Sequence, residues 1–66
     1  MKYNVEYVLR GTITYTVEAD SFEDAKRLGL VALSNDRLLN ELDADGELYY
    51  IERHNADGTF DEKYYL

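Results

Sequence analysis

Apolar and polar residues alternate along residues 2–19 in the manner of two β-strands. The first run, residues 3–9, carries an apolar side chain at every second position, and only Val8 breaks its polar face. Gly11 marks a turn, after which the alternation resumes over residues 12–19 with good strand formers on both faces. We expect an antiparallel hairpin whose inner face is formed by Tyr3, Val5, Tyr7, Leu9, Ile13, Tyr15 and Val17.

The spacing of apolar residues changes to three and four after Ser21, which predicts a helix that covers the hairpin. Asp20 or Ser21 can accept hydrogen bonds from the free N–H groups of the first turn, and residues 21–24 have the S-x-x-D spacing of a capping box. Gly29 costs up to about 1 kcal/mol against alanine inside a helix, so we expect it to permit a close approach to the sheet. The apolar stripe consists of Phe22, Ala25, Leu28 or Gly29, Ala32 and Leu33.

The helical pattern weakens at Asn35. Residues 34–36 can cap a short second helix over about residues 36–42, or the first helix can continue. We expect a break or a kink near Asn35, followed by a turn at residues 43–46.

Two further strands follow, over Glu47–Arg53 and Thr59–Leu66, joined by the turn signal of residues 55–58. The predicted fold class is α+β, a single domain over residues 1–66 with the element order ββαββ. One main helix packs on one face of an antiparallel sheet. On the fourth strand we expect one face to carry Phe60, Tyr64 and Leu66.

Each of the late strands contains two adjacent tyrosines, Tyr49-Tyr50 and Tyr64-Tyr65. Neighbours on a strand point to opposite faces, so one helix cannot cover both members of a pair. Either a second, exposed sheet face is lined by Tyr49, Ile51 and Tyr65, or that face is buried against something else. Tyrosine is common at interfaces, although it is also an ordinary strand residue.

Charge is distributed unevenly in this 66-residue chain, whose net charge is −7. Residues 36–66 carry nine acids and three bases, a net charge of −6, whereas residues 1–35 carry five acids and four bases, a net charge of −1. Such a field disfavours direct binding to nucleic acid or membranes and favours basic protein surfaces, and solubility alone also explains it. The chain has no cysteine, no signal-peptide pattern and no long apolar run, so we expect a complete, soluble, cytoplasmic protein.

Residues 41–52 have part of the spacing of an EF-hand calcium loop, including the glycine at the sharp turn. Glu41, however, stands where aspartate is usual, Tyr49 cannot act as a ligand, and Glu52 falls in a predicted strand. An acidic turn between a helix and a strand explains the same residues. A calcium site is therefore the less favoured interpretation, and its ligands would be Glu41, Asp43, Asp45 and Glu52.

Residues suited to catalysis are scarce. His54 is the one histidine and precedes a turn, while Ser21 and Ser34 have the positions of helix caps. A nucleophile with an oriented base is not recognisable, and there is no glycine-rich phosphate loop. We expect neither an enzyme nor a cofactor.

The strand–cap–helix segment carries a resemblance to known families. Tyr3-Asn4-Val5, followed by V-E-A-D-S-F-E-D-A at residues 17–25, resembles a unit of small phage and mobile-element proteins, including DpnD/PcfM-like proteins. In size and charge the chain is also similar to small acidic anti-CRISPR and anti-restriction proteins. The resemblance covers the N-terminal half and carries no functional residue across. It implies a phage-encoded inhibitor.

These observations favour a small acidic, non-catalytic protein that occupies the basic surface of a host nucleic-acid-processing or defence enzyme. The alternatives are a structural homodimer and, less favoured, a calcium-binding module. The predicted partner-binding residues are Asp36, Glu41, Asp43, Asp45, Glu47, Tyr49, Glu52 and Tyr65.

Overall fold

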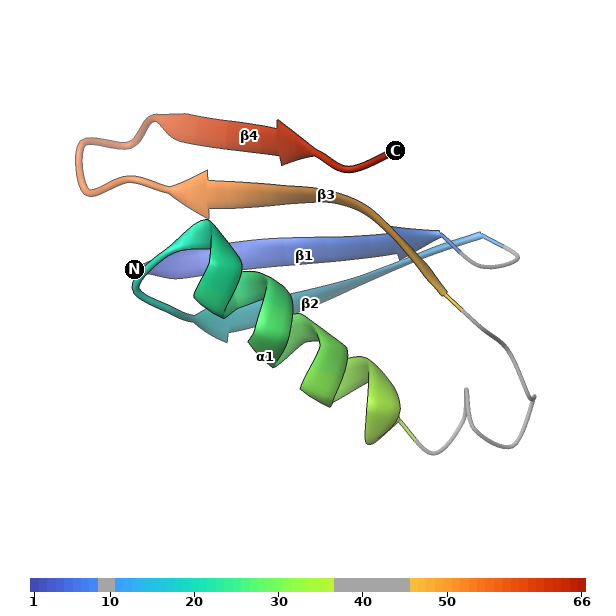
Figure 1. Ribbon diagram of the computed structural model, residues 1–66. Coiled ribbons are helices and arrows are strands. Elements are labelled where there is room, and N and C mark those ends of the chain that lie inside the picture. Colours follow the sequence, from blue (N-terminus) through green and yellow to red (C-terminus); the bar gives the residue numbers. More distant parts are fainter. Residues whose placement is uncertain (9–10, 37–45) are drawn as a thin grey trace.

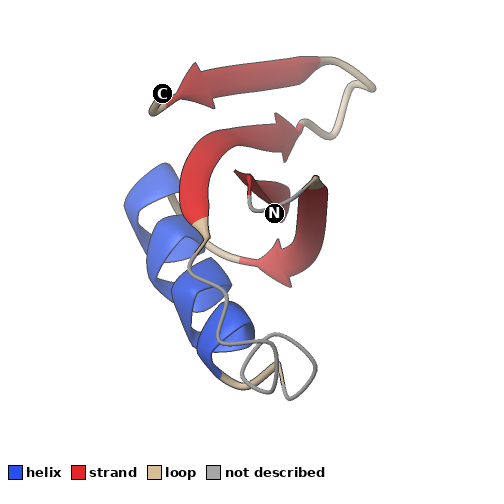
Figure 2. Ribbon diagram, turned by 90° about the vertical axis from the view of Figure 1, so that its right-hand side faces the viewer, coloured by secondary structure: helices blue, strands red, loops and turns tan. Residues whose placement is uncertain are grey.

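The strands form where the apolar alternation predicts them, and the helix covers one side of the sheet that they build. The computed structural model describes residues 1–8, 11–36 and 46–66. All neighbouring strands are antiparallel, in the order β2-β1-β3-β4, and α1 lies on one face only (Figures 1 and 2). The predicted α+β fold with the order ββαββ is confirmed. The elements are β1 (Lys2–Val8), β2 (Thr12–Glu18), α1 (Phe22–Ser34), β3 (Glu47–His54) and β4 (Phe60–Tyr64).

The core lies between α1 and the central strands. β1 pairs with β2 on one side and with β3 on the other, so its inner side chains are covered from three directions. Ile13, Tyr15 and Val17 of β2 are partly buried against this core, as the predicted hairpin face requires, while Leu9 lies outside the described residues. The buried residues are Tyr3, Val5, Tyr7, Ala19, Ala25 and Ile51.

The N-terminus of α1 is capped by Ser21, which settles the choice between Asp20 and Ser21. The Ser21 hydroxyl oxygen accepts a hydrogen bond of 3.1 Å from the backbone N–H of Asp24. The Asp24 carboxylate reaches back, but it accepts from the N–H of Asp20 at 3.4 Å, one residue before the cap. This pair of bonds resembles a capping box with its reciprocal bond shifted by one residue.

Gly29 permits the close packing that its place in the helix predicted. It is buried in α1, directly above β1. A Cβ atom at this position would lie 2.7 Å from Val5 Cγ1 and 3.0 Å from the Tyr7 hydroxyl oxygen. Both distances are shorter than van der Waals contact, so any larger residue would push the helix away from the sheet.

α1 ends where the sequence predicts a break. Its last residue is Ser34, and Asn35 is the C-cap, with its N–H donating to the Val31 carbonyl at 3.1 Å. The suggested short helix near residues 36–42 falls, apart from Asp36, outside the described residues.

β3 contains an irregularity that changes which side chains share a face. Glu6 of β1 lies opposite Tyr50, but the next residue, Tyr7, lies opposite Leu48, so Tyr49 is an extra residue on β3. Such a bulge resets the alternation of side chains along the strand. The suggestion of an exposed face lined by Tyr49, Ile51 and Tyr65 is therefore wrong. Ile51 is fully buried under α1, and Tyr65 is half-buried against the same core.

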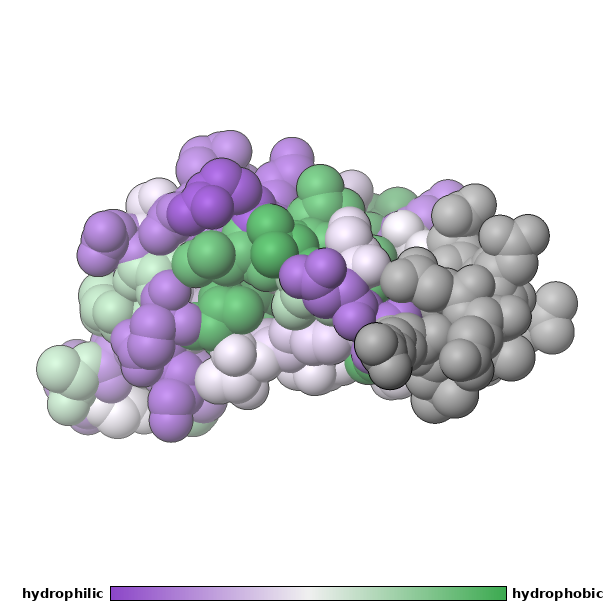
Figure 3. All heavy atoms as spheres, turned by 90° about the horizontal axis from the view of Figure 1, so that it is seen from below, coloured by the Kyte–Doolittle hydropathy of each residue, from purple (hydrophilic) through white to green (hydrophobic). Residues whose placement is uncertain are grey.

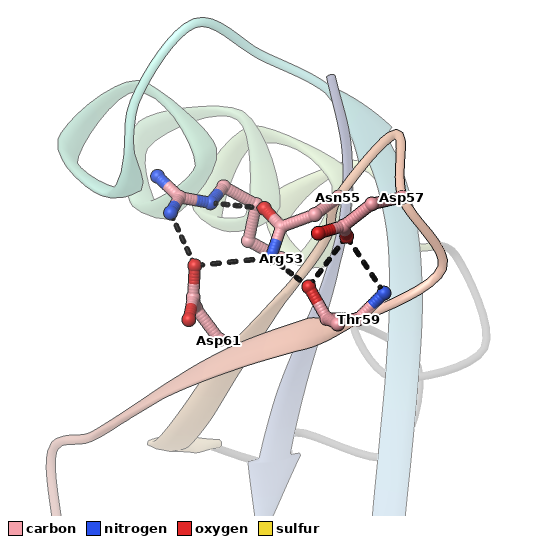
Figure 4. A network of polar contacts seen from close by, with 5 residues as sticks. All are labelled: Arg53, Asn55, Asp57, Thr59 and Asp61. Atoms are coloured by element: carbon pink, nitrogen blue, oxygen red, sulfur yellow. Dashed lines mark hydrogen bonds and ion pairs between the residues drawn. The ribbon is translucent and has the colours of Figure 1, made fainter.

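The β3–β4 turn is held by polar side chains (Figure 4). Arg53 forms an ion pair with Asp61 across the strands, and its Nε–H donates to the Asn55 side-chain oxygen at 3.0 Å. The Asp57 carboxylate accepts from both the N–H and the hydroxyl of Thr59, at 3.0 and 2.6 Å. This network fixes the turn and thereby the pairing of β4 with β3.

Candidate functional site

The side of the sheet opposite α1 is the candidate site, and we call it the open face. The inner residues of β1 are buried under the helix, so the alternating residues point the other way. The register carries the same assignment to the other strands. The open face is formed by Lys2, Asn4, Glu6, Val8, Thr12, Thr14, Thr16, Glu18, Glu47, Tyr50, Glu52, His54, Phe60, Glu62 and Tyr64.

A cluster of three tyrosines lies at the β3–β4 side of this face. The rings of Tyr50 and Tyr64 are stacked, with centroids 5.3 Å apart, because the two residues lie opposite each other on paired strands. The bulge brings Tyr49 to the same cluster, where its ring meets Tyr50 edge-on at 5.3 Å and Tyr64 at 5.8 Å. Tyr64 is 57% exposed, so the cluster presents aromatic surface to solvent.

Carboxylates surround the tyrosine cluster. The Tyr64 hydroxyl donates a hydrogen bond of 2.7 Å to Glu62, which raises the pKa of Tyr64 to about 12. The pKa of Tyr50 is raised by burial and then by the negative charges of Glu6, Glu52 and Glu62. Three acids from three strands therefore act on a single phenol.

A polar chain crosses the other end of the face. The Asn4 side-chain oxygen accepts from the Thr16 hydroxyl at 2.7 Å, and its amide nitrogen lies 2.9 Å from His54 Nε2. The same imidazole nitrogen lies 3.2 Å from Glu52, and the ring meets Phe60 edge-on at 4.7 Å. These contacts link all four strands by side chains and hold Glu52 near the centre of the face.

The two sides of the sheet differ in charge. The open face carries Glu6, Glu18, Glu47, Glu52 and Glu62 against Lys2. Arg53 lies opposite the inner residue Tyr3. Lys63 lies opposite the inner residue Ile51 and over the ring of Tyr65. Both therefore belong to the helix-bearing side. Lys26 and Arg27 lie on α1 itself. Among the described residues, four of the five lysines and arginines thus lie on the helix-bearing side, and only Lys2 shares the open face with the glutamates.

The predicted partner-binding residues are spread over several places. Tyr49 and Glu52 belong to the open-face cluster. Glu47 is exposed at the start of β3, on the open face opposite Val8. Tyr65 packs on the helix-bearing side, and the Asp36 carboxylate accepts from the Tyr15 hydroxyl at 2.8 Å. Glu41, Asp43 and Asp45 lie outside the described residues.

Four members of the open-face cluster were missed by sequence reasoning: Glu6, Tyr50, Glu62 and Tyr64. A signal for two of them was present, because regular alternation places one ring of an adjacent pair on each side of the sheet. Tyr64 and Tyr65 follow this rule, whereas the bulge brings both Tyr49 and Tyr50 to one cluster. The strand register, which the sequence does not state, decides which ring that is.

Of the four ligands of the calcium alternative, only Glu52 lies within the described residues. Glu52 lies inside β3, paired with Asn4, whereas the twelfth residue of an EF-hand loop begins a helix. Within residues 1–8, 11–36 and 46–66 no group of three potential metal ligands comes together. Nor does any helix in these ranges have the length and apolar character to cross a membrane.

Comparison of the chain with models of protein families, with curated proteins and with solved structures gives no match.

Proposed function

We propose that this protein is a small non-catalytic binding module that docks its open face on a basic surface of another protein. The observation that carries the proposal is the cluster of half-buried Tyr49 and Tyr50 with exposed Tyr64, which has Glu6, Glu52 and Glu62 around it. Aromatic rings supply rigid contact area, and carboxylates supply attraction to lysine and arginine. The two types of group stand together on the same face.

Elsewhere in the chain, aromatic rings are paired with lysine or arginine side chains in cation–π contacts. On the helix-bearing side, Lys26 and Lys63 lie 5.4 and 5.5 Å from the centroid of Tyr65, and Arg53 lies 5.3 Å from that of Phe22. No described lysine or arginine is placed in this way over the open-face tyrosines. A partner's arginine could therefore stack on these rings and pair with the glutamates, with each exposed cation–π contact contributing about 0.5–1 kcal/mol.

The partner that we favour is a nucleic-acid-processing or defence enzyme, because enzymes of this kind carry basic surfaces for phosphate groups. An acidic module on that surface would exclude the nucleic acid and thereby inhibit the enzyme. In this proposal the protein is phage-encoded and acts in the host cytoplasm. Negative charge on the open face would steer the encounter and make association sensitive to salt.

The test is affinity capture from host lysate with matched variants. The variant Glu6→Gln/Glu62→Gln removes two carboxylates of the cluster, and Asp20→Asn/Glu23→Gln removes two from the loop and first turn of α1. Both change the net charge by the same amount. We expect the first variant to lose its partner at moderate salt and the second to retain it. Equal loss in both would show that total charge, and not the open face, drives binding, and the proposal would fail.

A further inference from the structure

β2 has an outer edge with which no described strand pairs, because it stands at the end of the strand order. Met1 and Ala19 exchange both backbone hydrogen bonds, at 2.9 and 3.0 Å. Antiparallel pairs alternate between bonded and non-bonded positions, so every second residue of β2 turns its N–H and C=O away from β1. These residues are Thr12, Thr14, Thr16 and Glu18.

The two free edges of the sheet differ in charge. β4 has five residues, and three of them are the charged Asp61, Glu62 and Lys63. β2 has seven residues, and residues 12–17 contain no charge and no proline. Charges, prolines and short length are the usual means by which proteins keep a sheet edge from pairing. β4 has such protection, whereas β2 lacks it over most of its length.

We propose that the β2 edge pairs antiparallel with the β2 edge of a second copy of this chain, forming a symmetric dimer. With Tyr15 at the two-fold axis, the outward-facing groups of Thr14 meet those of Thr16 of the second copy. On the inner side, Ile13 lies opposite Val17 and Tyr15 opposite itself. Threonine therefore pairs with threonine, an aliphatic residue with an aliphatic residue, and tyrosine with tyrosine. Cross-strand threonine and aromatic pairs are favourable.

The lack of charge on residues 12–17 of β2 permits a second copy to occupy this edge, and the threonine and apolar pairs of the antiparallel register favour it. Two molecules of net charge −7 repel each other wherever acids face acids. Electrostatic repulsion between the two molecules is weakest where the uncharged residues of the two β2 strands face each other. Figure 3 shows the molecule from the side on which β2 and α1 lie, and hydrophobic residues gather across its middle. Val31 of α1 is 48% exposed, so the helix adds apolar surface to be covered.

The dimer joins two four-stranded sheets into one continuous sheet. Because the two-fold axis is perpendicular to the sheet, both open faces lie on the same side. The inference does not depend on the proposed function, since it concerns the edge of the sheet and not its face. Loss of partner binding by the open-face variants would leave the dimer intact.

Charge variants at the two central threonines provide the first test, in sedimentation velocity from micromolar to several hundred micromolar protein. In Thr14→Lys/Thr16→Lys, a lysine of each copy faces a lysine of the other, and we expect dimerisation to weaken about tenfold or more. In Thr14→Lys/Thr16→Glu, opposite charges meet at the same two positions, so the dimer should persist. Both variants lose the same two side-chain hydrogen bonds, from Thr14 to Glu6 and from Thr16 to Asn4, and should therefore fold alike.

Hydrogen exchange of backbone amides provides the second test. In the dimer, the N–H groups of Thr14 and Thr16 should be protected at high concentration and exchange rapidly at low concentration. The β4 amides of Glu62 and Tyr64 should exchange at the same rate in both conditions. A monomer at the highest concentration would overturn the proposal. So would a dimer that tolerates the Lys/Lys variant, or one that protects β4 instead of β2.

Discussion

The hydroxyl of Tyr15 donates a hydrogen bond of 2.8 Å to the carboxylate of Asp36. Tyr15 lies in the middle of β2, and Asp36 lies just beyond the C-cap of α1. The bond therefore ties the end of the helix to the sheet, while the Ser34 hydroxyl donates to the Leu30 carbonyl at 2.9 Å within the helix itself. Asp36, which the charge pattern assigned to partner binding, has a structural role in the folded chain.

The Tyr15–Asp36 bond makes stability depend on alkaline pH. Burial, followed by the hydrogen bond to Asp36 and its negative charge, raises the pKa of Tyr15 from 10.0 to about 12. Since the folded pKa is above the unfolded one, the stabilisation is fully present below pH 10 and is lost as the pH rises toward 12. Urea unfolding at several pH values should show this loss, and Tyr15→Phe and Asp36→Asn should both reduce it. An alkaline loss as steep in Tyr15→Phe as in the wild type would contradict the assignment.

Gly29→Ala should destabilise the protein, although alanine is the better helix former. The gain in helix propensity is up to about 1 kcal/mol, whereas overpacking against Val5 and Tyr7 costs about 1–3 kcal/mol. We expect a net loss measured as a lower midpoint of chemical unfolding. Leu30→Ala is the matched control on the exposed side of the same helix, and its effect should stay within about 0.5 kcal/mol. Unchanged or increased stability in Gly29→Ala would show that the helix can shift without cost.

The sequence was sufficient for the fold because the signals there are local. Apolar alternation defines β1 and β2, and Ser21 with Gly29 defines the start and the packing of α1. The composition of the open face was harder to predict, because it depends on one extra residue in β3. Without the bulge at Tyr49, alternation places Tyr49 and Ile51 on the same face, and the structure separates them. A bulge is set by pairing with β1, which lies far away along the chain.

Tyr3→Phe should leave stability unchanged or increase it. The Tyr3 ring is fully buried and packs edge-on against Phe22 at a centroid distance of 5.4 Å. Its hydroxyl is also buried and makes no hydrogen bond of good geometry among the described residues, although it lies near enough to the Arg53 guanidinium to help raise the pKa of Arg53. Removing a buried, unpaired hydroxyl relieves its desolvation cost, so the free energy of unfolding should stay the same or rise.

In contrast, Tyr15→Phe removes the hydrogen bond to Asp36 and should lower the free energy of unfolding by about 0.5–1.5 kcal/mol. A comparable loss in the two variants would mean that Tyr3 has a partner in solution.

The β3–β4 turn should weaken in acid through Asp61. Hydrogen bonds from Arg53 and Asn55 lower the pKa of this carboxyl below its ordinary value of 3.8. A depressed folded pKa stabilises the protein above the unfolded pKa, and the stabilisation is lost as the pH falls through the folded value. Asp61→Asn keeps the shape of the side chain but removes its charge, so the stability of this variant at neutral pH should be lower and its acid dependence flatter.

Because the ion pair is exposed to solvent, high salt should reduce the difference in stability between Asp61→Asn and the wild type at neutral pH. Denaturation followed by circular dichroism between pH 2 and 7 would measure both effects. Parallel acid profiles for Asp61→Asn and the wild type would show that Asp61 does not contribute to the acid dependence.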